Sequence, residues 1–459
     1  MARKRARQKA ERLKVLGREL RLGGFWARRV ELVGLRVPVA AIAVVSTLAL
    51  VAVTVWGIIF SHAPDHITEP IERRYAVTDD AFLRSMGVLL GPGLLPGNQV
   101  DTLINGDEIF PAMLDAIRSA KSTITFETYV YWKGEIGRQF AEALADRAKA
   151  GVKVHVLLDW EGSKRMEKEW IEQMQRAGVQ VEKYHRPHWQ SYRDLNKRTH
   201  RKLLVVDGRV GFTGGVGIAD EWTGTAQDKN HWRDTHYRIT GPVVAQLQGT
   251  FGDNWTQVRG EVLHGDEYFP PLQPTGTLRA QMFKSSVEGG AESLQIMYLL
   301  SFAAATRTID LAMAYFIPDE HTLDHIVAAL RRGVRVRIIT PGRDTDSKLV
   351  WLASRANWGR ILENGGEVYE YEPTMYHCKV LVVDGVWTSV GSTNFDSRSF
   401  RLNDEANLNV YDRAFAQRQT VDFENDLKRA RQITYEMWKR RPWYEKVVEH
   451  IVAFFEPQL

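Results

Sequence analysis

The sequence predicts an α/β protein of two similar lobes, preceded by one N-terminal transmembrane helix. Three observations support this prediction. The pattern HxKxxxxD occurs twice, in "HRKLLVVD" and in "HCKVLVVD". Each copy follows a segment in which strand-like and helix-like patterns alternate, which favours two α/β sandwich lobes related by pseudo-symmetry. A run of 24 uncharged residues, Val37 to Phe60, lies near the N-terminus.

The uncharged run is long enough to cross a membrane. At about 1.5 Å per residue, such a helix exceeds a hydrocarbon core of about 30 Å. Residues 1–36 hold twelve Lys and Arg against three acids, so the positive-inside tendency places them in the cytoplasm and the later residues outside it. A cleaved signal peptide is the alternative, but its charged and apolar segments are normally shorter. We therefore expect a basic cytoplasmic segment (1–36), a transmembrane helix (37–60) and a linker (61–104).

The basic composition says little about the partner of the larger part of the chain. The formal net charge is +5, and residues 1–36 alone contribute twelve minus three, or +9, which leaves −4 for the rest. Basic residues beside a membrane helix serve topology and bind anionic lipid headgroups. A nucleic-acid partner would require a basic groove in the remaining part, so none is expected.

The first lobe is predicted over residues 105–265. "KSTITFETYVYW" is a strand pattern, and the helix after it shows apolar residues at helical spacing before Gly151, which is placed to end it. A strand, a second helix and "AGVQVEKYH" then lead to the first motif. The apolar positions of the first helix are Ile136, Phe140, Ala143, Leu144 and Ala148.

The second lobe is predicted over residues 266–435 and repeats this order. "TRTIDLAMAYFI", "IVAALRRGVRVRIITP" and "NGGEVYEYE" parallel the segments of the first lobe. Asp319 can cap a helix that Gly333 ends. Residues 436–459 form an amphipathic tail that either packs on the core or lies at a membrane surface.

Both motifs end buried strands. Leu203–Val206 and Val380–Val383 are apolar, mostly β-branched and followed by Asp-Gly turns. Alternate strand residues share a face, so the His and Lys of each copy point the same way. If the copies meet, two imidazoles and two ammonium groups surround a group such as a phosphodiester. The candidate residues are His200, Lys202, Asp207, His377, Lys379 and Asp384.

The residues after the motifs also correspond, with one difference. Gly214 and Gly215 begin seven residues after Asp207, and Gly391 and Ser392 begin seven after Asp384. Asn394 follows, but the equivalent position in the first copy is Gly217, so a backbone N–H or a water would have to replace its amide. We expect Gly215, Ser392 and Asn394 at the phosphate.

The doubled motif, the Gly-rich turns and the internal repeat resemble the phospholipase D superfamily. Within it, "RTHRKLLVVDGRVGFTGGVGIADEW", "WRDTH" and "VGSTNFDSRSFRLNDEANL" resemble the bacterial cardiolipin synthases. The resemblance implies a phosphohistidine intermediate, with His200 as nucleophile and His377 as acid and base, although the order of the two is open. Lys202, Lys379 and Asn394 would then neutralise the phosphoryl oxygens.

The resemblance also implies one orienting acidic residue downstream of each motif. The matching positions are Asp234 in "WRDTH" and Glu405 in "NDEAN". Asp207 and Asp384 would hold the motif turns together. No metal and no cofactor is expected.

The implied activity is the synthesis of cardiolipin from two phosphatidylglycerol molecules with release of glycerol. The implied location is the bacterial inner membrane, with a single pass and the catalytic part extracytoplasmic. The alternatives are a phospholipase D that hydrolyses phospholipid to phosphatidic acid, a nuclease-type phosphodiesterase and a non-catalytic lipid-binding protein. The family commonly begins with two membrane spans, whereas "FLRSMGVLLGPGLLPG" is a poor spanning helix that could lie at the interface.

Other residues have structural interpretations. Cys378 is expected to be a small core residue, since it would face away from the phosphate. His321 and His325 have the spacing of zinc ligands, but a solvated helix face is the preferred interpretation. Two interpretations stay open for the polar connection before the first motif, a rim of the substrate entrance or an ordinary loop. Its candidate residues are His185, His188, Trp189 and Tyr192.

Overall fold

The structure is a computed structural model of the 459-residue chain. It describes residues 29–32, 35–60, 69–186, 196–286, 293–443, 445–446 and 449. The chain divides into two compact units, Met1–Ala63 and Pro64–Leu459.

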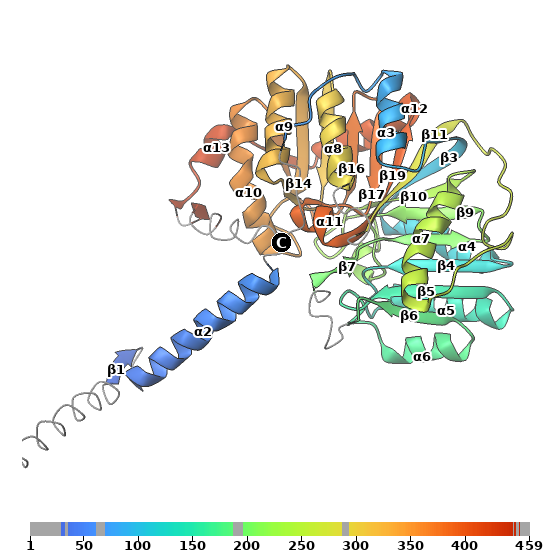
Figure 1. Ribbon diagram of the computed structural model, residues 1–459, viewed down its shortest axis with the longest axis horizontal. Helices are drawn as coiled ribbons and strands as arrows, with labels where there is room; N and C mark the ends of the chain where they lie inside the picture. Colours follow the sequence, from blue (N-terminus) through green and yellow to red (C-terminus); the bar gives the residue numbers. More distant parts are fainter. Residues whose placement is uncertain are drawn as a thin grey trace, which may run out of the picture. The chain divides into compact units, whose positions relative to one another are not determined.

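The first unit contains a short hairpin and one helix. Strands β1 (Arg29–Leu32) and β2 (Leu35–Pro38) pair antiparallel, and α2 follows from Val39 to Phe60 (Figure 1). A search of the described residues finds no helix with both the length and the hydropathy needed to cross a membrane.

The second unit is built on one large mixed sheet. Its strands run in the order β20-β15-β14-β12-β16-β17-β19-β11-β3-β10-β9-β8-β4-β5-β6. From β15 to β11 the order mirrors that from β6 to β3, so the two halves of the chain meet where β11 pairs with β3. The sequence repeat is therefore visible as a repeat of strand order.

The first half contributes the elements between residues 80 and 259. These are α3 (Asp80–Leu89), β3 (Leu95–Ile104), α4 (Asn105–Ser119), β4 (Thr123–Thr128), α5 (Glu135–Lys149), β5 (Lys153–Asp159), α6 (Lys168–Arg176), β6 (Gln180–Tyr184), β7 (Arg198–Thr199), β8 (Leu203–Val206), β9 (Val210–Gly214), the 3₁₀ turn η2 (Asp220–Trp222), β10 (Thr235–Thr240) and α7 (Val244–Arg259).

The second half contributes the elements from residue 278 onward. These are β11 (Leu278–Ser285), α8 (Ser293–Ala304), β12 (Thr308–Met313), β13 (Phe316–Ile317), α9 (Glu320–Arg331), β14 (Arg335–Pro341), α10 (Lys348–Glu363), β15 (Glu367–Tyr371), β16 (Lys379–Val383), β17 (Trp387–Gly391), β18 (Phe395–Asp396), α11 (Ser397–Arg401), β19 (Asn403–Tyr411), α12 (Arg413–Leu427), β20 (Ala430–Ile433) and α13 (Tyr435–Lys439).

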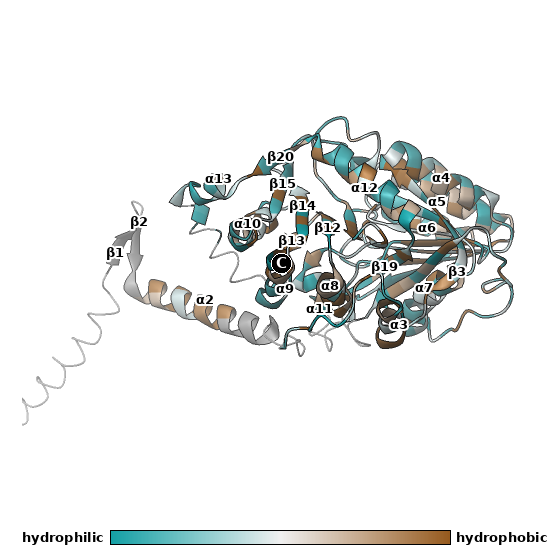
Figure 2. Ribbon diagram, turned by 90° about the horizontal axis from the view of Figure 1, so that it is seen from above, coloured by the Kyte–Doolittle hydropathy of each residue, from teal (hydrophilic) through white to brown (hydrophobic). Residues whose placement is uncertain are grey.

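Helices cover the sheet in both halves. Figure 1 shows α8, α9 and α10 next to one another in the second half, and α4, α5 and α6 pack in succession in the first. Helices α4, α5, α6 and α9 carry both hydrophobic and hydrophilic residues (Figure 2), as amphipathic helices do when one side faces a core, whereas α8 is buried on nearly all sides. Helices α7 and α12 pack on a shared apolar cluster that holds residues of both halves, among them Leu247, Val205, Val382 and Phe415.

Several predicted elements are confirmed. Helix α5 includes the predicted apolar positions, and Gly151 after it has φ +92°. The Asp319 side chain accepts a hydrogen bond from the backbone N–H of Thr322 and so caps α9. Strand β8 has the predicted bounds.

Two expectations need correction. The segment 61–104 was expected to be a linker, but it contains α3 and the central strand β3. His321 and His325 do not form a solvated face, since His325 is buried and its Nε2 accepts from the backbone N–H of Ile71. His321 Nε2 lies 3.0 Å from the backbone oxygen of Glu69. The pair thus fixes the chain before α3 against α9.

The C-terminal tail is described only in part. Trp438 in α13 packs on the second-half core, and its indole N–H donates to the backbone oxygen of Arg355 at 2.7 Å. Trp443 is 76% exposed. Residues 450–459, which contain most of the amphipathic run, lie outside the described residues.

Candidate active site

Each motif histidine is held by the backbone of the other half of the chain. Strand β7 pairs in parallel with the start of β19, and the His200 N–H donates to the Asp404 carbonyl at 2.8 Å. In the mirrored position, Arg233 and Tyr376 form a parallel bridge, and the His377 N–H donates to the Arg233 carbonyl at 2.7 Å. The fold therefore places each histidine beside the acidic residue that follows the opposite motif.

His200 is paired with Glu405. Its Nδ1 lies 3.0 Å from both carboxylate oxygens, which leaves Nε2 as the nitrogen that faces away from the carboxylate. Burial lowers the pKa of His200 to about 4, although Glu405 opposes the shift. Burial would raise the pKa of Glu405, but His200 and Lys202 hold it below its ordinary value. The pair is thus a neutral imidazole fixed in one orientation by an ionised carboxylate.

His377 is paired with Asp234. Its Nδ1 lies 2.7 Å from Oδ2, which also accepts from the Trp222 indole N–H at 2.9 Å. Burial and the adjacent Lys379 lower the pKa of His377. Burial alone would raise the pKa of Asp234, but His377 and Lys379 keep it below its ordinary value. Both histidines therefore have a buried carboxylate on Nδ1, and the pairs cross between the two halves.

Both motif lysines are buried next to the histidines. Lys202 donates to the His200 carbonyl at 2.6 Å, and Lys379 donates to the His377 carbonyl at 2.7 Å. Burial lowers the pKa of Lys202 to about 7, and burial also lowers the pKa of Lys379. Lys379 further lowers the pKa of His200 and of Lys202, so the two motifs share one electrostatic environment. An anion such as a phosphodiester would relieve this accumulation of positive groups.

The motif aspartates face the turns. Asp207 accepts from the backbone N–H groups of Lys121, Ser122 and Thr123, at 2.7 to 3.1 Å. Asp384 makes the matching bonds to residues 306–308, at 2.7 to 2.9 Å. Both residues have positive φ, +51° and +52°. Their carboxylates are thus used inside the turn that ends each motif strand.

The three residues expected at the phosphate differ in their surroundings. Asn394 is 4% exposed, and its Oδ1 has no hydrogen-bond partner among the described residues. The Ser392 hydroxyl donates instead to Glu405 at 2.5 Å, and the Gly215 N–H donates to the Thr235 carbonyl. Ser392 and Gly215 thus make hydrogen bonds to Glu405 and Thr235, and their place at the phosphate stays a prediction. The unpartnered Asn394 atom is an acceptor, so the amide N–H₂ is the group that could donate to a phosphate.

Aromatic residues missed by the sequence analysis surround the histidines. Tyr129 lies 5.0 Å from His200 between ring centroids, and Trp222 and Trp232 lie 5.2 Å and 5.6 Å from His377. One signal could have found Trp222. Gly217 stands where the other half has Asn394, and a missing side chain suggests that a large neighbour fills its space.

The polar connection before the first motif is only partly described. His185 Nε2 lies 3.6 Å from Oδ2 of Asp404, the residue whose carbonyl holds His200. His188, Trp189 and Tyr192 lie outside the described residues. Cys378 is 1% exposed, and burial raises the pKa of its thiol to about 12, as expected of a core residue.

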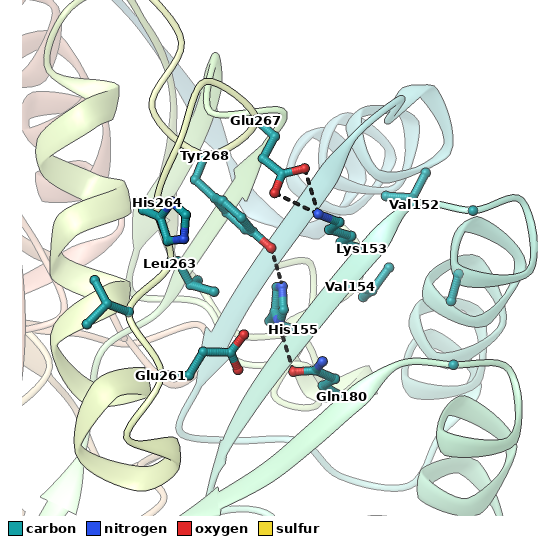
Figure 3. A pocket seen from close by; sticks show the side chains of 14 residues that line it. Val152, Lys153, Val154, His155, Gln180, Glu261, Leu263, His264, Glu267 and Tyr268 are labelled. Atoms are coloured by element: carbon teal, nitrogen blue, oxygen red, sulfur yellow. Dashed lines mark hydrogen bonds and ion pairs between the residues drawn. The ribbon is translucent and has the colours of Figure 1, made fainter.

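A separate polar cavity of about 430 Å³ lies in the first half, away from the motif residues (Figure 3). His155 lies in it, but its ring nitrogens are 2.8 Å from the Tyr268 hydroxyl and 3.2 Å from Oε1 of Gln180. No cluster of three or more potential metal-ligating side chains occurs among the residues that the structure describes.

Comparison with known proteins identifies the family. The family model described as "Cardiolipin synthase, PLD-like domain" matches residues 113–255 and 299–427. The chain is 35% identical over 365 residues to a cardiolipin synthase of Geobacillus thermodenitrificans, covering 79% of this chain and 72% of that protein. It is 34% identical over 365 residues to the major cardiolipin synthase ClsA of Bacillus subtilis, covering 79% and 76%.

A solved structure shares the fold. The phosphatidylserine synthase of Haemophilus influenzae superposes with a TM-score of 0.61 at 16% identity, covering 83% of this chain and all of that one. The fold and the doubled motif thus define a phospholipase D-like protein. More narrowly, the chain belongs to the cardiolipin synthase family.

Proposed function

We propose that this chain is a membrane-anchored phosphatidyltransferase that makes cardiolipin from two phosphatidylglycerol molecules and releases glycerol. One observation carries the proposal. Two buried imidazoles, each with a carboxylate on Nδ1 and a lysine beside it, share one environment in a chain of the cardiolipin synthase family. Such a site is suited to covalent transfer at a phosphodiester.

The first step forms a phosphohistidine. Nε2 of His200 attacks the phosphorus, the bond from phosphorus to the glycerol oxygen breaks, and His377 gives its proton to the leaving glycerol. His200 suits the attack because its pKa of about 4 keeps it unprotonated near neutral pH, and the bound phosphodiester anion would raise the lowered pKa of His377 so that this imidazole carries the proton it gives. Lys202, Lys379 and the Asn394 amide neutralise the developing charge on the phosphoryl oxygens.

The second step returns the histidines to their initial state. A hydroxyl of a second phosphatidylglycerol attacks the phosphohistidine, His377 takes the hydroxyl proton, and the bond from Nε2 to phosphorus breaks. Asp234 and Glu405 keep both imidazoles oriented throughout and stabilise whichever ring is positive. A reaction that passes through two such states requires both halves of the chain.

The membrane arrangement is also part of the proposal. Residues 37–60 would span the bacterial inner membrane once, residues 1–36 would remain in the cytoplasm, and the two lobes, 105–265 and 266–435, would lie outside it. The excess of Lys and Arg over acidic residues in residues 1–36 supports this orientation. Anchorage would keep the enzyme in the plane that holds both lipid substrates and so raise their effective concentration.

The test is a product analysis of the full-length protein in detergent with phosphatidylglycerol and a chelator. Cardiolipin and free glycerol in equal amounts are the expected products. Phosphatidic acid as the sole product would make the enzyme a hydrolase, and cleavage of added DNA would make it a nuclease. Absence of any product would leave a lipid-binding role and contradict the proposal.

A further inference from the structure

The two half-sites support their carboxylates differently. Behind Glu405, the supporting donor is the Ser392 hydroxyl. The equivalent of Ser392 in the first half is Gly215, where a Cβ atom would lie 2.2 Å from Oδ1 of Asp234. No side chain fits there, so a serine cannot support Asp234. The Trp222 indole N–H donates to Oδ2 of this carboxylate instead, and the Thr235 backbone N–H donates to its Oδ1 at 2.8 Å.

Trp222 also lies near the position of a second missing side chain, where Val130 is the closer neighbour. A Cβ atom on Gly217, the equivalent of Asn394, would lie 3.3 Å from Cη2 of Trp222 and 2.6 Å from Cβ of Val130. The indole is 2% exposed and lies at 86° to the His377 ring. The first half thus has glycines where the second half has a serine and an asparagine, and the Trp222 indole supplies a side-chain donor to the carboxylate.

We propose that Trp222 is a positioning residue for the Asp234–His377 pair. Its indole N–H fixes the carboxylate and its ring packs against the imidazole. The structural part of this proposal stands on the contacts, and its link to catalysis rests on the proposed function. The N–H stabilises the ionised carboxylate, so without it Asp234 attracts a proton more strongly and the pKa of His377 rises.

Other charged groups face this pair and stay constant in the test. Lys379 and Asp346 act on His377, and Lys379 also acts on Asp234. Lys202 and His236 interact with Asp234 from the first half. None of these residues is changed in the variants below, so a shift in the pKa of His377 can be attributed to the indole.

The experiment replaces Trp222 with 3-benzothienylalanine, which keeps the ring and its volume and removes only the N–H donor. Trp222→Phe is the genetically simple version. Trp132→Phe is the matched control, because Trp132 packs on Trp222 at 6.1 Å but donates to the Gly162 carbonyl instead. Labelled histidine and an assignment variant, His377→Gln, allow the pKa of His377 to be measured by NMR in the full-length protein.

The expected result in both Trp222 variants is a rise of less than about one unit in the pKa of His377, because the hydrogen bond to Asp234 is lost in both protonation states of the imidazole. The alkaline limb of kcat/KM should move to higher pH with it, and kcat/KM should fall about tenfold or more. Trp132→Phe should show neither change.

An unchanged pKa of His377 in the benzothienylalanine protein would overturn the inference, even if Trp222→Phe failed to fold. The NMR arm does not depend on turnover. An inactive wild type with the expected pKa rise would therefore refute the proposed function and leave the positioning role supported.

Discussion

At the scale of single residues, the central finding is that each histidine of the site is completed by the other half of the chain. His200 is held by Glu405 and His377 by Asp234. Neither pairing could be predicted from the sequence, because the orienting acidic residue that follows each motif serves the histidine of the opposite motif. Register between β7 and β19, which no local pattern specifies, decides the pairing.

The proposed roles of the two histidines predict that the two alanine variants differ in whether the covalent intermediate forms. His200→Ala and His377→Ala should each lower kcat by several orders of magnitude, since neither half of the relay works alone. Rapid denaturation at alkaline pH, where the phosphohistidine bond survives, with phosphatidylglycerol labelled at its phosphorus, should trap labelled protein in wild type and none in His200→Ala. Labelled protein in His200→Ala and none in His377→Ala would exchange the two roles.

His236 predicts how stability depends on pH. It is 1% exposed, its ring nitrogens have no partner among the described residues, and burial lowers its pKa to about 4. Between pH 6.5 and 4, His236 is therefore protonated in the unfolded chain and neutral in the folded chain. The free energy of unfolding decreases as pH falls through that window. The free energy of unfolding decreases by about 3 kcal/mol in total through this residue.

The test is His236→Asn, which places the residue found at the equivalent position, Asn407. Between pH 6.5 and 4, its melting temperature should fall less steeply than that of wild type. His264→Asn, at an exposed histidine, should keep the wild-type slope. Identical slopes in wild type and His236→Asn would contradict the prediction.

At the scale of elements, the sequence predicted those with regular apolar patterns. The strands and helices that precede each motif in the two halves are of this kind. Strand β3 could not be predicted, because Pro96 and Gly97 give "LPGNQVDTLI" the signature of a turn. Pairing with β10 and β11 on its two sides outweighs that local preference.

One buried ion pair joins the first half of the site to α12. Arg233 donates to both carboxylate oxygens of Asp426 at 2.9 Å, and it also donates to the Asp234 carbonyl at 2.7 Å. Asp426→Ala should therefore cost about 3–5 kcal/mol of unfolding free energy, because it leaves a buried guanidinium without its counter-charge. Urea denaturation followed by tryptophan fluorescence measures the loss.

The double variant Arg233→Met with Asp426→Leu removes both charges and should recover most of that stability. A double variant as unstable as Asp426→Ala would show that the pair is not the cause. Arg138→Ala, which breaks ion pairs on α5 whose side chains are all 45–58% exposed, is the control and should change stability by less than about 1 kcal/mol.

At the scale of the whole molecule, the proposed anchor and the proposed site fall in different compact units. Residues 64–459 contain the sheet, its cores and the site, and residues 1–63 form a unit of their own. The proposed anchor acts by keeping the enzyme with its substrates. Deleting residues 1–63 should therefore leave the melting temperature nearly unchanged and preserve activity on detergent-solubilised phosphatidylglycerol.

The same deletion should lower activity on intact vesicles at least tenfold, because the effective concentration gained by anchorage is lost. Flotation of vesicles on a density gradient measures binding alongside turnover. Full vesicle activity in the shortened protein would remove the anchor from the proposed function. A reporter fused after Leu459 tests the orientation separately, since activity of a cytoplasm-dependent reporter alone would reverse it.

The crossed support of the histidines has a consequence for how this chain arose. A single copy of the repeat would contain a histidine and an acidic residue that do not pair with each other. An ancestral single-copy polypeptide would therefore have needed to dimerise to pair them. Gene duplication and fusion would then have made the association permanent. Once joined, the copies were free to diverge, and the glycines at the positions equivalent to Ser392 and Asn394 in only one of them are a difference that an identical pair would not have had.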